Sequence, residues 1–500
     1  MVHLKINNIP VEVKEGSTIL EAAKAAGINI PTLCYLKEIN EIGACRVCVC
    51  EVKGARSLVA ACVYPVNEGM EVFTNTEKVR KSRKTTLELL LSDHKKECLS
   101  CVRSTNCELQ KLSNEYGCDE NRFQGARSEY EEDNSTSYLV RDNEKCILCR
   151  RCVAVCKKVQ EVAVIAPSRR GFNTHIACAF ESDLNDAPCV ACGQCVAVCP
   201  TGALREREEI DNVREAINDP EKVVVVAAAP AVRAAIGEEF GYPIGTNTEG
   251  KMFTAMRMLG FDKVFDVNFG ADLTILEEAN ELLHRVKEGG TLPMFTSCSP
   301  GWIRFVEYYY PELIPNLSSC KSPMQMFGAT VKTYWAQKEG IDPKNIYVVG
   351  VMPCTAKKFE KTRDDENASG YPDIDAVLTT RELAKMIKNS GILYNELPDG
   401  TFDNPLGEFT GAGVIFGATG GVMEAALRTA AEKLTGKPLD NVEFKQVRGI
   451  KGIKEAEYDL NGTKVKVAVA SGLTNAKELC EKIKKGECDY TFVEVMCCPG

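Results

Sequence analysis

The sequence predicts a multidomain protein in which a cysteine-rich α+β region precedes a larger α/β region. At 500 residues the chain is long enough for three or four domains. Its 25 cysteines are unevenly spread, since eighteen lie between Cys34 and Cys199 and the next is Cys298. After that gap, apolar runs typical of buried strands alternate with helical patterns. The two parts of the chain therefore differ in architecture.

The composition is that of a soluble globular protein, with 44% hydrophobic and 26% charged residues. The formal charge of −9 argues against nucleic acid as a partner, because phosphate binding needs clustered Lys and Arg. Residues 1–6 alternate like a strand and lack an apolar signal core. The most apolar run, residues 223–232, is about half as long as a membrane span. We therefore expect a cytoplasmic protein without a membrane span, whose thiols are reduced.

The first cysteine set has the spacing Cys-x10-Cys-x2-Cys-x13-Cys and comprises Cys34, Cys45, Cys48 and Cys62. A CxxC loop with one further cysteine on each side is typical of a plant-type 2Fe–2S site, although the first gap is longer than usual. Strand patterns at residues 5–6 and 11–13 suit the β-grasp sheet of such ferredoxins. Zinc is the alternative. We expect a 2Fe–2S domain over residues 1–78.

The second set combines one of only four histidines with three cysteines: His94, Cys98, Cys101 and Cys107. One imidazole and three thiolates can bind zinc tetrahedrally, and they can equally hold a 4Fe–4S cluster. The spacing leaves both alternatives open. The position of this set between other cluster sites favours iron–sulfur, in a small domain over residues 79–125.

Two further runs share the spacing Cys-x2-Cys-x2-Cys-x3-Cys, and the second ends in Cys-Pro. In bacterial ferredoxins with two clusters, the fourth cysteine of each run ligates the other cluster. We therefore predict a domain over residues 138–210 with two 4Fe–4S clusters. One is assigned to Cys146, Cys149, Cys152 and Cys199, and the other to Cys189, Cys192, Cys195 and Cys156.

Apolar runs predict strands in the second part of the chain, at residues 223–229, 346–351, 376–378 and 413–416. Residues 423–434 are strong helix formers with an apolar stripe. Three cysteine-bearing loops accompany them. They read TSCSPGW at residues 296–302, MPCTAKKFE at 352–360 and VEVMCCPG at 493–500.

With these loops and the preceding ligand sets, the sequence resembles the catalytic subunit of an iron–iron hydrogenase. The likeness is to the multi-cluster type found in NAD(P)-linked, electron-bifurcating complexes, and it covers essentially all 500 residues. It implies a two-lobed α/β hydrogenase domain over residues 220–500, after the three cluster domains. It also implies one 2Fe–2S cluster, three accessory 4Fe–4S clusters and an active-site 4Fe–4S cubane. The cubane is linked to a two-iron unit that carries CO, cyanide and an azadithiolate.

The resemblance assigns roles to residues of the three loops and their surroundings. Cys354 matches a cubane ligand, and Cys498 matches the cysteine that bridges the cubane and the two-iron unit, or its neighbouring ligand. Lys357 matches a residue that hydrogen-bonds a cyanide. Met352 and Met496 match the apolar wall around the two-iron unit, and Phe416 belongs to the same apolar shell. Pro230 matches a backbone segment near the other cyanide.

Glu278 and Glu281 are three residues apart and therefore share a helix face. Without the resemblance, the pattern predicts that the two carboxylates lie on a solvent-exposed helix face. The resemblance instead implies a carboxylate proton path that is linked through Ser318 to Cys298, with Arg285 at its outer end.

The activity implied is the reversible reduction of protons to H2, with electrons relayed through four accessory clusters. The relay would lead to or from ferredoxin and a flavin- and NAD(P)-binding partner subunit, and maturation proteins would assemble the active centre. A G-x-G-x-x-G fingerprint after a strand is absent from the sequence, which is why we expect nucleotide binding in a partner.

Two other functions remain open at this point. An electron-transfer subunit without hydrogen chemistry, such as the large iron–sulfur subunit of respiratory NADH dehydrogenase, shares the arrangement of the first 210 residues but lacks the three loops. A hydrogenase-like protein of iron–sulfur assembly or sensing would keep cubane ligands and lose the two-iron unit.

Two substitutions depart from the family pattern. The family usually reads TSCCP, where the first cysteine is generally the proton donor and the second a cubane ligand; here Ser299 takes the second place. A serine oxygen binds iron poorly. Either Cys298 shifts to ligate the cubane, or the cluster is weakened or absent. Cys497 stands where the family usually has alanine, and its extra thiol could compensate for a displaced proton donor.

The end of the sequence also departs from the pattern. The family's last loop continues with Gly-Cys, whereas this sequence stops at Pro499-Gly500. We expect a C-terminally truncated domain, an incomplete active centre and little hydrogenase activity from these residues alone.

Overall fold

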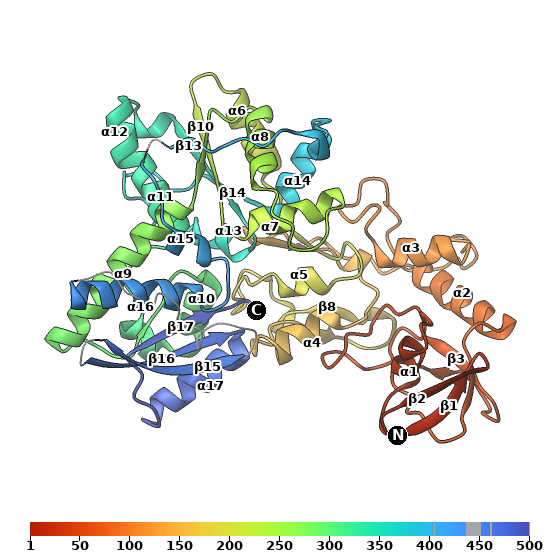
Figure 1. Ribbon diagram of the computed structural model, residues 1–500. Coiled ribbons are helices and arrows are strands. Elements are labelled where there is room, and N and C mark those ends of the chain that lie inside the picture. The colour runs from red at the N-terminus through yellow and green to blue at the C-terminus, as the bar shows by residue number, and fades with distance from the viewer. Residues whose placement is uncertain (405, 437–451, 461–462, 500) are drawn as a thin grey trace. The chain divides into compact units, whose positions relative to one another are not determined.

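The computed structural model describes residues 1–404, 406–436, 452–460 and 463–499 (Figure 1). The chain forms two compact units, which are described separately. The N-terminal unit comprises Met1–Cys189 and Gln194–Glu206, and the C-terminal unit comprises Val190–Gly193 and Arg207–Gly500. Gly500, which ends both the expected 220–500 domain and the third cysteine loop, lies outside the described residues.

The N-terminal unit begins with a five-stranded sheet in the order β2-β1-β5-β3-β4. Its strands are β1 (Val2–Ile6), β2 (Ile9–Val13), β3 (Val49–Val52), β4 (Val59–Ala60) and β5 (Glu71–Phe73). β1 and β2 pair antiparallel across a turn at Asn7 and Asn8, where asparagine tolerates the positive φ of both positions. Helix α1 (Ile19–Ala25) starts in a capping box of Thr18 and Glu21. The predicted ferredoxin-like β-sheet is thus confirmed.

The rest of the N-terminal unit is made of short elements. Its helices are α2 (Glu77–Ser92), α3 (Glu108–Glu115), α4 (Arg151–Lys158) and α5 (Gln194–Val198), and its strands are β6 (Leu139–Arg141), β7 (Ala166–Ser168), β8 (His175–Ala177) and β9 (Leu204–Glu206). β6 pairs with β9 antiparallel, and α4 packs on α5. Because β6 precedes the first ferredoxin-like run and β9 follows the second, this pairing folds the two runs back on each other.

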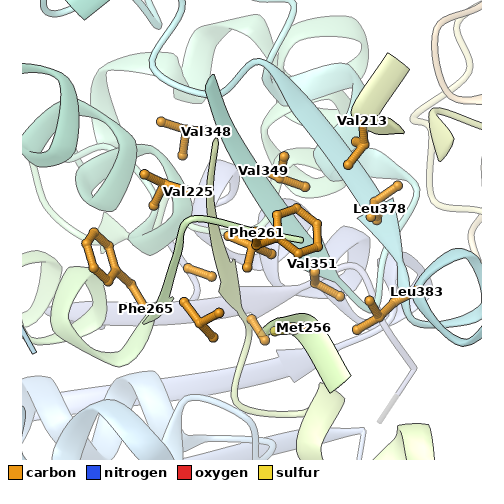
Figure 2. Close-up of a cluster of buried hydrophobic side chains, with 14 of the residues drawn as sticks. Val213, Val225, Met256, Phe261, Phe265, Val348, Val349, Val351, Leu378 and Leu383 are labelled. Carbon is orange, nitrogen blue, oxygen red and sulfur yellow. The ribbon is translucent and has the colours of Figure 1, made fainter. Parts of the chain in front are cut away.

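The first sheet of the C-terminal unit is entirely parallel, in the order β11-β10-β13-β14. Its strands are β10 (Val223–Ala228), β11 (Lys263–Asp266), β13 (Ile346–Met352) and β14 (Ala376–Thr379). Three of them confirm strands expected from apolar runs. Valines of β10 and β13 are buried on both faces of the sheet (Figure 2), as in parallel sheets that are covered by helices on both sides.

Helices and the second sheet complete this unit. The helices are α6 (Ile210–Asn218), α7 (Val232–Ala235), α8 (Glu249–Met258), α9 (Asn268–Glu288), α10 (Pro300–Tyr309), α11 (Pro323–Thr330), α12 (Ala336–Glu339), α13 (Ala356–Glu360), α14 (Thr380–Asn389), α15 (Gly411–Ile415), α16 (Gly421–Thr435) and α17 (Leu473–Lys484). The second sheet has the order β12-β17-β16-β15 and comprises β12 (Met294–Phe295), β15 (Ile453–Leu460), β16 (Thr463–Ser471) and β17 (Phe492–Met496). β12 and β16 are both parallel to β17, and helices α16 and α17 pack against this sheet (Figure 1).

The expected strand at residues 413–416 is wrong, because the chain there is helical. Helix α15 starts after Thr410, whose side chain accepts a hydrogen bond from the backbone of Ala412, and it packs against α9. A short apolar run fits a strand and a buried helical turn equally well, so the cap and the neighbouring helix decide. The helix expected over residues 423–434 is confirmed by α16. Among the described residues, none of the helices is long and apolar enough to span a membrane.

Candidate functional site

The three cysteine loops of the C-terminal unit follow the ends of parallel strands. β12 leads into Cys298, β13 into Cys354, and β17 into Cys497 and Cys498. Sites in α/β folds form at the carboxyl ends of parallel strands. A hydrogen bond of 3.1 Å from Lys357 Nζ to the Cys298 carbonyl joins a loop of the first sheet to a loop of the second. The structure therefore brings these loops together.

Lys357 is held in place by its neighbours. Its ammonium group donates to both carboxylate oxygens of Glu360, at 3.0 and 2.9 Å, one helical turn further along α13. Glu360 also accepts a hydrogen bond of 2.9 Å from Ser322 Oγ. With its third bond on the Cys298 carbonyl, Lys357 presents a fixed positive charge beside the first loop. Glu360 belongs to the same MPCTAKKFE loop but was not among the predicted site residues; its spacing of three from Lys357 is the sequence signal for the ion pair.

Cys298 is buried among charged groups. Burial raises the pKa of its thiol well above the usual value, the Glu278 carboxylate raises it further, and the Lys357 ammonium lowers it. Next to it, Ser299 Oγ accepts a hydrogen bond of 3.1 Å from the backbone N–H of Cys497. In the second loop, burial and the nearby Cys498 thiol raise the pKa of Cys354 to about 12.

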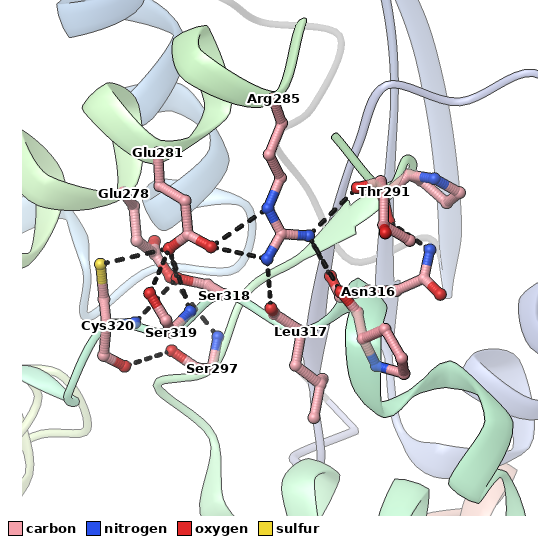
Figure 3. A network of polar contacts seen from close by, with 12 residues as sticks. Glu278, Glu281, Arg285, Thr291, Ser297, Asn316, Leu317, Ser318, Ser319 and Cys320 are labelled. Atoms are coloured by element: carbon pink, nitrogen blue, oxygen red, sulfur yellow. Dashed lines mark hydrogen bonds and ion pairs between the residues drawn. The ribbon is translucent and has the colours of Figure 1, made fainter. Parts of the chain in front are cut away.

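A row of polar groups runs from Ser297, the neighbour of Cys298, through Glu278, Ser318 and Glu281 to Arg285 (Figure 3). Glu278 and Glu281 lie on one face of α9, and the Ser318 hydroxyl is within hydrogen-bonding reach of both. The Ser318 hydroxyl donates to Glu281 Oε2 at 3.3 Å. The backbone N–H of Ser297 donates to Glu278 Oε1 at 3.4 Å. The structure thus links Glu278 and Glu281 through Ser318, and it places the Glu278 carboxyl within electrostatic reach of the Cys298 thiol.

The two carboxyl groups of this row have opposite electrostatics. Glu278 is only 1% exposed, and its Oε2 has no hydrogen-bond partner within the described parts of the chain. Burial raises the pKa of Glu278 to about 7. Burial alone would also raise the pKa of Glu281, but hydrogen bonds from Ser319 and Arg285 outweigh it and hold that pKa below the ordinary value. Near neutral pH, Glu278 is therefore present in both its protonated and its ionised form, whereas Glu281 stays ionised.

Arg285 closes the outer end of the row. Its Nη2 and Nε donate to Glu281 Oε1 at 2.6 and 3.1 Å. The remaining N–H groups donate to the backbone carbonyls of Thr291, Pro315, Asn316 and Leu317. This network orients Glu281 toward Ser318, because the guanidinium is fixed by the protein on its other side.

Two residues of this network, Ser319 and Cys320, were not among the predicted site residues. Ser319 donates to Glu281 Oε2 from its backbone N–H and from its hydroxyl, both at 3.0 Å. The Cys320 thiol is 3.8 Å from the same oxygen, and the Cys320 carbonyl accepts a hydrogen bond of 2.6 Å from Ser297 Oγ. Ser318, Ser319 and Cys320 are consecutive polar residues, which is the sequence signal that could have revealed them.

The four residues expected around the two-iron unit lie at the ends of the two sheets. Met352 ends β13 and is buried, and Pro230 follows the neighbouring strand β10. Pro230 approaches Gly417 so closely that a Cβ there would be 3.3 Å from the proline Cβ, which places Phe416 next to this edge. Met496 ends β17 in the second sheet.

In the N-terminal unit, the four cysteines of the first set are buried and converge. Cys48 Sγ and Cys62 Sγ are 3.3 Å apart, and the Cys34 thiol is hydrogen-bonded to those of Cys45 and Cys62. These contacts lower the pKa of Cys34 and raise that of Cys62. Four convergent thiols are a donor set that fits a 2Fe–2S cluster.

His94 is buried, and its Nδ1 has no hydrogen-bond partner in the ranges that the structure describes. Burial and the Lys145 charge lower the pKa of His94 to about 4, so its imidazole is neutral at pH 7 and can ligate a metal. The Cys101 thiol interacts electrostatically with those of Cys98 and Cys107. This donor set fits a cluster. Across the described ranges, no three His, Cys, Asp or Glu side chains are grouped so as to hold a single metal ion.

Replacing His94 with alanine should remove the cluster assigned to this set, lowering iron and sulfide by about four atoms each per chain. The His94→Cys variant should retain them, because a thiolate replaces the imidazole. Metal and sulfide analysis of the purified protein tests this, with His175→Ala as the control for loss of a buried histidine. One zinc per chain in the wild type, lost in His94→Ala, would contradict the iron–sulfur assignment.

An apolar pocket in the N-terminal unit is lined by the thiols of Cys146, Cys149, Cys152 and Cys199. Cys199 comes from the second run, so the structure groups these residues as the exchange of fourth cysteines predicts. Of the other set, Cys156, Cys189 and Cys195 belong to the N-terminal unit, whereas Cys192 belongs to the segment 190–193 of the C-terminal unit.

The backbones of the two runs fold alike. φ is positive at the residue before the second cysteine and at the residue after it: 53° and 62° at Leu148 and Arg150, and 59° and 70° at Ala191 and Gly193. Leucine, arginine and alanine rarely adopt this conformation, and it is concentrated at functional loops. The repeated geometry is that of a loop wrapped around a ligand.

Four family models match the chain in sequence order. They are described as a 2Fe–2S iron–sulfur cluster binding domain (residues 1–77), an NADH-ubiquinone oxidoreductase-G iron–sulfur binding region (83–122), a 4Fe–4S dicluster domain (145–203) and the iron only hydrogenase large subunit, C-terminal domain (222–500).

Two similar proteins match over almost the whole chain, and a similar solved structure matches more than half of it. The NADP-reducing hydrogenase subunit HndD of Solidesulfovibrio fructosivorans is 50% identical, over 100% of this chain and 87% of the relative. Iron hydrogenase 1 of Clostridium pasteurianum is 47% identical, and the match covers 99% of this chain and 86% of the relative. A solved structure of a variant of the [FeFe]-hydrogenase HydA1 from Chlamydomonas reinhardtii is 45% identical with a TM-score of 0.52, covering 59% of this chain and 82% of that one.

Proposed function

Because the chain belongs to the iron-only hydrogenase family, we propose that its three cysteine loops, at Cys298, Cys354 and Cys498, hold the active centre of the enzyme. The protein is a hydrogenase that interconverts H2 with protons and electrons, and it carries 2Fe–2S and 4Fe–4S clusters. The observation that supports the assignment of the site is the group of acid–base side chains beside Cys298: the Glu278 carboxyl lies within electrostatic reach of the Cys298 thiol, and the Ser318 hydroxyl is hydrogen-bonded to both Glu278 and Glu281.

Cys354 and Cys498 would hold the 4Fe–4S cubane, and the cubane would be linked to a two-iron unit with CO, cyanide and azadithiolate ligands. When bound, that unit supplies the iron at which H2 is formed and split. Lys357 would donate a hydrogen bond to a cyanide from the position that Glu360 fixes. Met352, Met496, Pro230 and Phe416 would exclude water from the unit.

The protein's own groups move the protons. During H2 oxidation, the Glu278 carboxylate accepts a proton from the Cys298 thiol and passes it through the Ser318 hydroxyl to Glu281. The low pKa of Glu281 favours release of the proton to water near Arg285. During H2 evolution the proton travels in the opposite direction. A pKa of about 7 allows Glu278 to accept and donate a proton at neutral pH.

The accessory clusters would form the electron relay, in domains over residues 1–78, 79–125 and 138–210, ahead of the hydrogenase domain over 220–500. We place the 2Fe–2S cluster on the first cysteine set and one 4Fe–4S cluster on each of the three other sets. The name of the HndD relative, an NADP-reducing hydrogenase subunit, supports an NAD(P)-binding partner subunit. We propose that this partner carries flavin and that ferredoxin is a second partner. We also propose that the enzyme works in the cytoplasm and is matured by assembly proteins.

Production of the protein together with hydrogenase maturation proteins tests the site. We expect infrared bands of CO and cyanide; H2 evolution from a reduced viologen then decides between a working centre and the incomplete centre with little activity that the sequence pattern predicts. A protein with intact accessory clusters but without these bands would contradict the proposed active centre and favour a plain electron-transfer role.

Ser318→Ala should slow turnover by about tenfold, because the hydrogen bond that links the two carboxyl groups is lost. The rate of H2 oxidation measures this effect. The matched control is Ser319→Ala, which removes a hydroxyl that contacts Glu281 alone. Equal rates for the two variants would show that Ser318 is not part of the path.

A further inference from the structure

We propose that Cys497 supplies a thiolate to the 4Fe–4S cluster of the active centre, in the place that Ser299 leaves without a thiol. This inference rests on the proposed function, since it takes the cluster to lie at these loops. It also assigns Cys298 to proton transfer alone.

The thiols of the C-terminal unit's loops fall into two groups by their neighbours. Cys298 interacts with Glu278, Lys357, Glu494 and Glu360, which are all charged side chains. Cys497 instead interacts with other thiols: it lies within electrostatic reach of Cys354 and Cys498, the two proposed cubane ligands, and it is hydrogen-bonded to Cys192, which is assigned to an accessory cluster. Iron–sulfur clusters are bound by several thiolates that converge on one site. The convergent group contains Cys497 and not Cys298.

The two substitutions in the loops contact each other. Ser299 Oγ accepts a hydrogen bond of 3.1 Å from the backbone N–H of Cys497, and both residues are buried. The serine hydroxyl is therefore turned toward the residue that carries the additional thiol. A hydroxyl is also much less acidic than a thiol and a harder ligand for iron. Cys497 is thus the adjacent residue that can supply what Ser299 cannot.

The chain makes room for the Cys497 thiol. A Cβ on Gly301 would lie 2.8 Å from Cys497 Sγ, closer than real Cβ contacts allow, and 3.1 Å from the Cys497 Cβ, which is a tight contact. Only glycine at 301 lets the first turn of α10 approach the thiol this closely. The thiol is buried, with Cys497 4% exposed, so it is directed into the protein.

Ligation changes no oxidation state. The Cys497 thiol releases its proton to solvent, and the resulting thiolate donates an electron pair to one iron of the cluster. Because the backbone N–H of Cys497 points to Ser299, this hydroxyl becomes a positioning group that orients the ligand loop. Cys298 then keeps its proton for exchange with Glu278.

The test uses the full chain produced without maturation proteins, so that only iron–sulfur clusters are counted. Cys497→Ala should lose about four iron and four sulfide atoms per chain relative to wild type. Cys497→Ser should lose the same number, although it preserves size. The double variant Ser299→Cys/Cys497→Ala should regain them, and Cys298→Ala should keep the full count. Electron paramagnetic resonance of the reduced proteins reports separately on the accessory clusters and hence on folding.

Full iron in Cys497→Ala, loss of iron in Cys298→Ala, or failure of the double variant to recover would each overturn the inference. These outcomes are distinct from failure of the proposed function. Absence of CO and cyanide bands after maturation, with full iron content, would overturn the proposed site and leave the ligand assignment standing. A Cys497→Ala variant that keeps its full iron content and evolves H2 would overturn the ligand assignment and leave the proposed function standing.

Discussion

Replacing Glu278 with glutamine should lower the rate of H2 turnover by roughly 10²- to 10⁴-fold, the usual contribution of a positioned acid–base group. The amide keeps the size of the side chain and can hydrogen-bond Ser318, but it cannot take up and release a proton. Assays of both reaction directions measure the loss. Infrared spectra and iron content should stay those of the wild type, because Glu278 holds no metal.

The pH dependence separates this role from a structural one. The folded pKa of Glu278 is raised to about 7, so its proton-accepting carboxylate is present above that pH and is lost as the pH falls through 7. Wild-type H2 oxidation should therefore rise through an inflection near pH 7, which disappears in Glu278→Gln. The control is Glu277→Gln, which changes the exposed neighbour on the same helix. A similar loss in both variants, or an unchanged inflection in Glu278→Gln, would refute the role of Glu278.

Replacing Cys354 with alanine should abolish H2 turnover and remove about four iron and four sulfide atoms per chain. Cys354 sits where β13 ends, and its thiol lies near that of Cys498. Without this ligand the cubane has no support from the first sheet, and a two-iron unit linked to it would have no anchor. Metal analysis of unmatured protein and infrared spectra of matured protein measure the two losses separately.

Cys480→Ala provides the matched control, since Cys480 is a fully buried thiol in helix α17. Its removal should leave the iron count and the infrared bands unchanged, and it should lower the free energy of unfolding by about 1 kcal/mol, as expected for a small cavity. Retention of full iron in Cys354→Ala would exclude it as a cubane ligand.

Most of the architecture could be predicted because its signals are local. The valines of β10 and β13 form continuous apolar runs, and a parallel sheet covered on both faces requires such runs. The grouping of Cys199 with Cys146 follows from the spacing rule for two-cluster ferredoxins. The strand prediction for residues 413–416 was wrong because the helical conformation there depends on the Thr410 cap and on packing against α9.

The site was predicted less completely because part of it depends on pairs that are distant in sequence. The spacing of Glu278 and Glu281 predicts a shared face, but it does not predict the burial that raises the pKa of Glu278 or the hydrogen bonds from Ser319 that help to lower the pKa of Glu281. Likewise, in the sequence alone Ser299 and Cys497 are two unrelated differences from the family pattern. Their hydrogen bond across 198 positions appears only in the folded protein.

The three-residue link between β13 and α13 has a consequence for how this protein can vary. Met352 ends the strand, Cys354 is the proposed ligand, and Lys357 lies in the first turn of the helix. Thr355, between them, donates a hydrogen bond of 2.7 Å to the carbonyl of Ala191, next to Cys192. One inserted residue would change the positions of Met352, Cys354, Lys357 and the Thr355 hydrogen bond relative to one another. We therefore expect the length of this link to be invariant in evolution and in design libraries, where side chains can be exchanged but residues cannot be added.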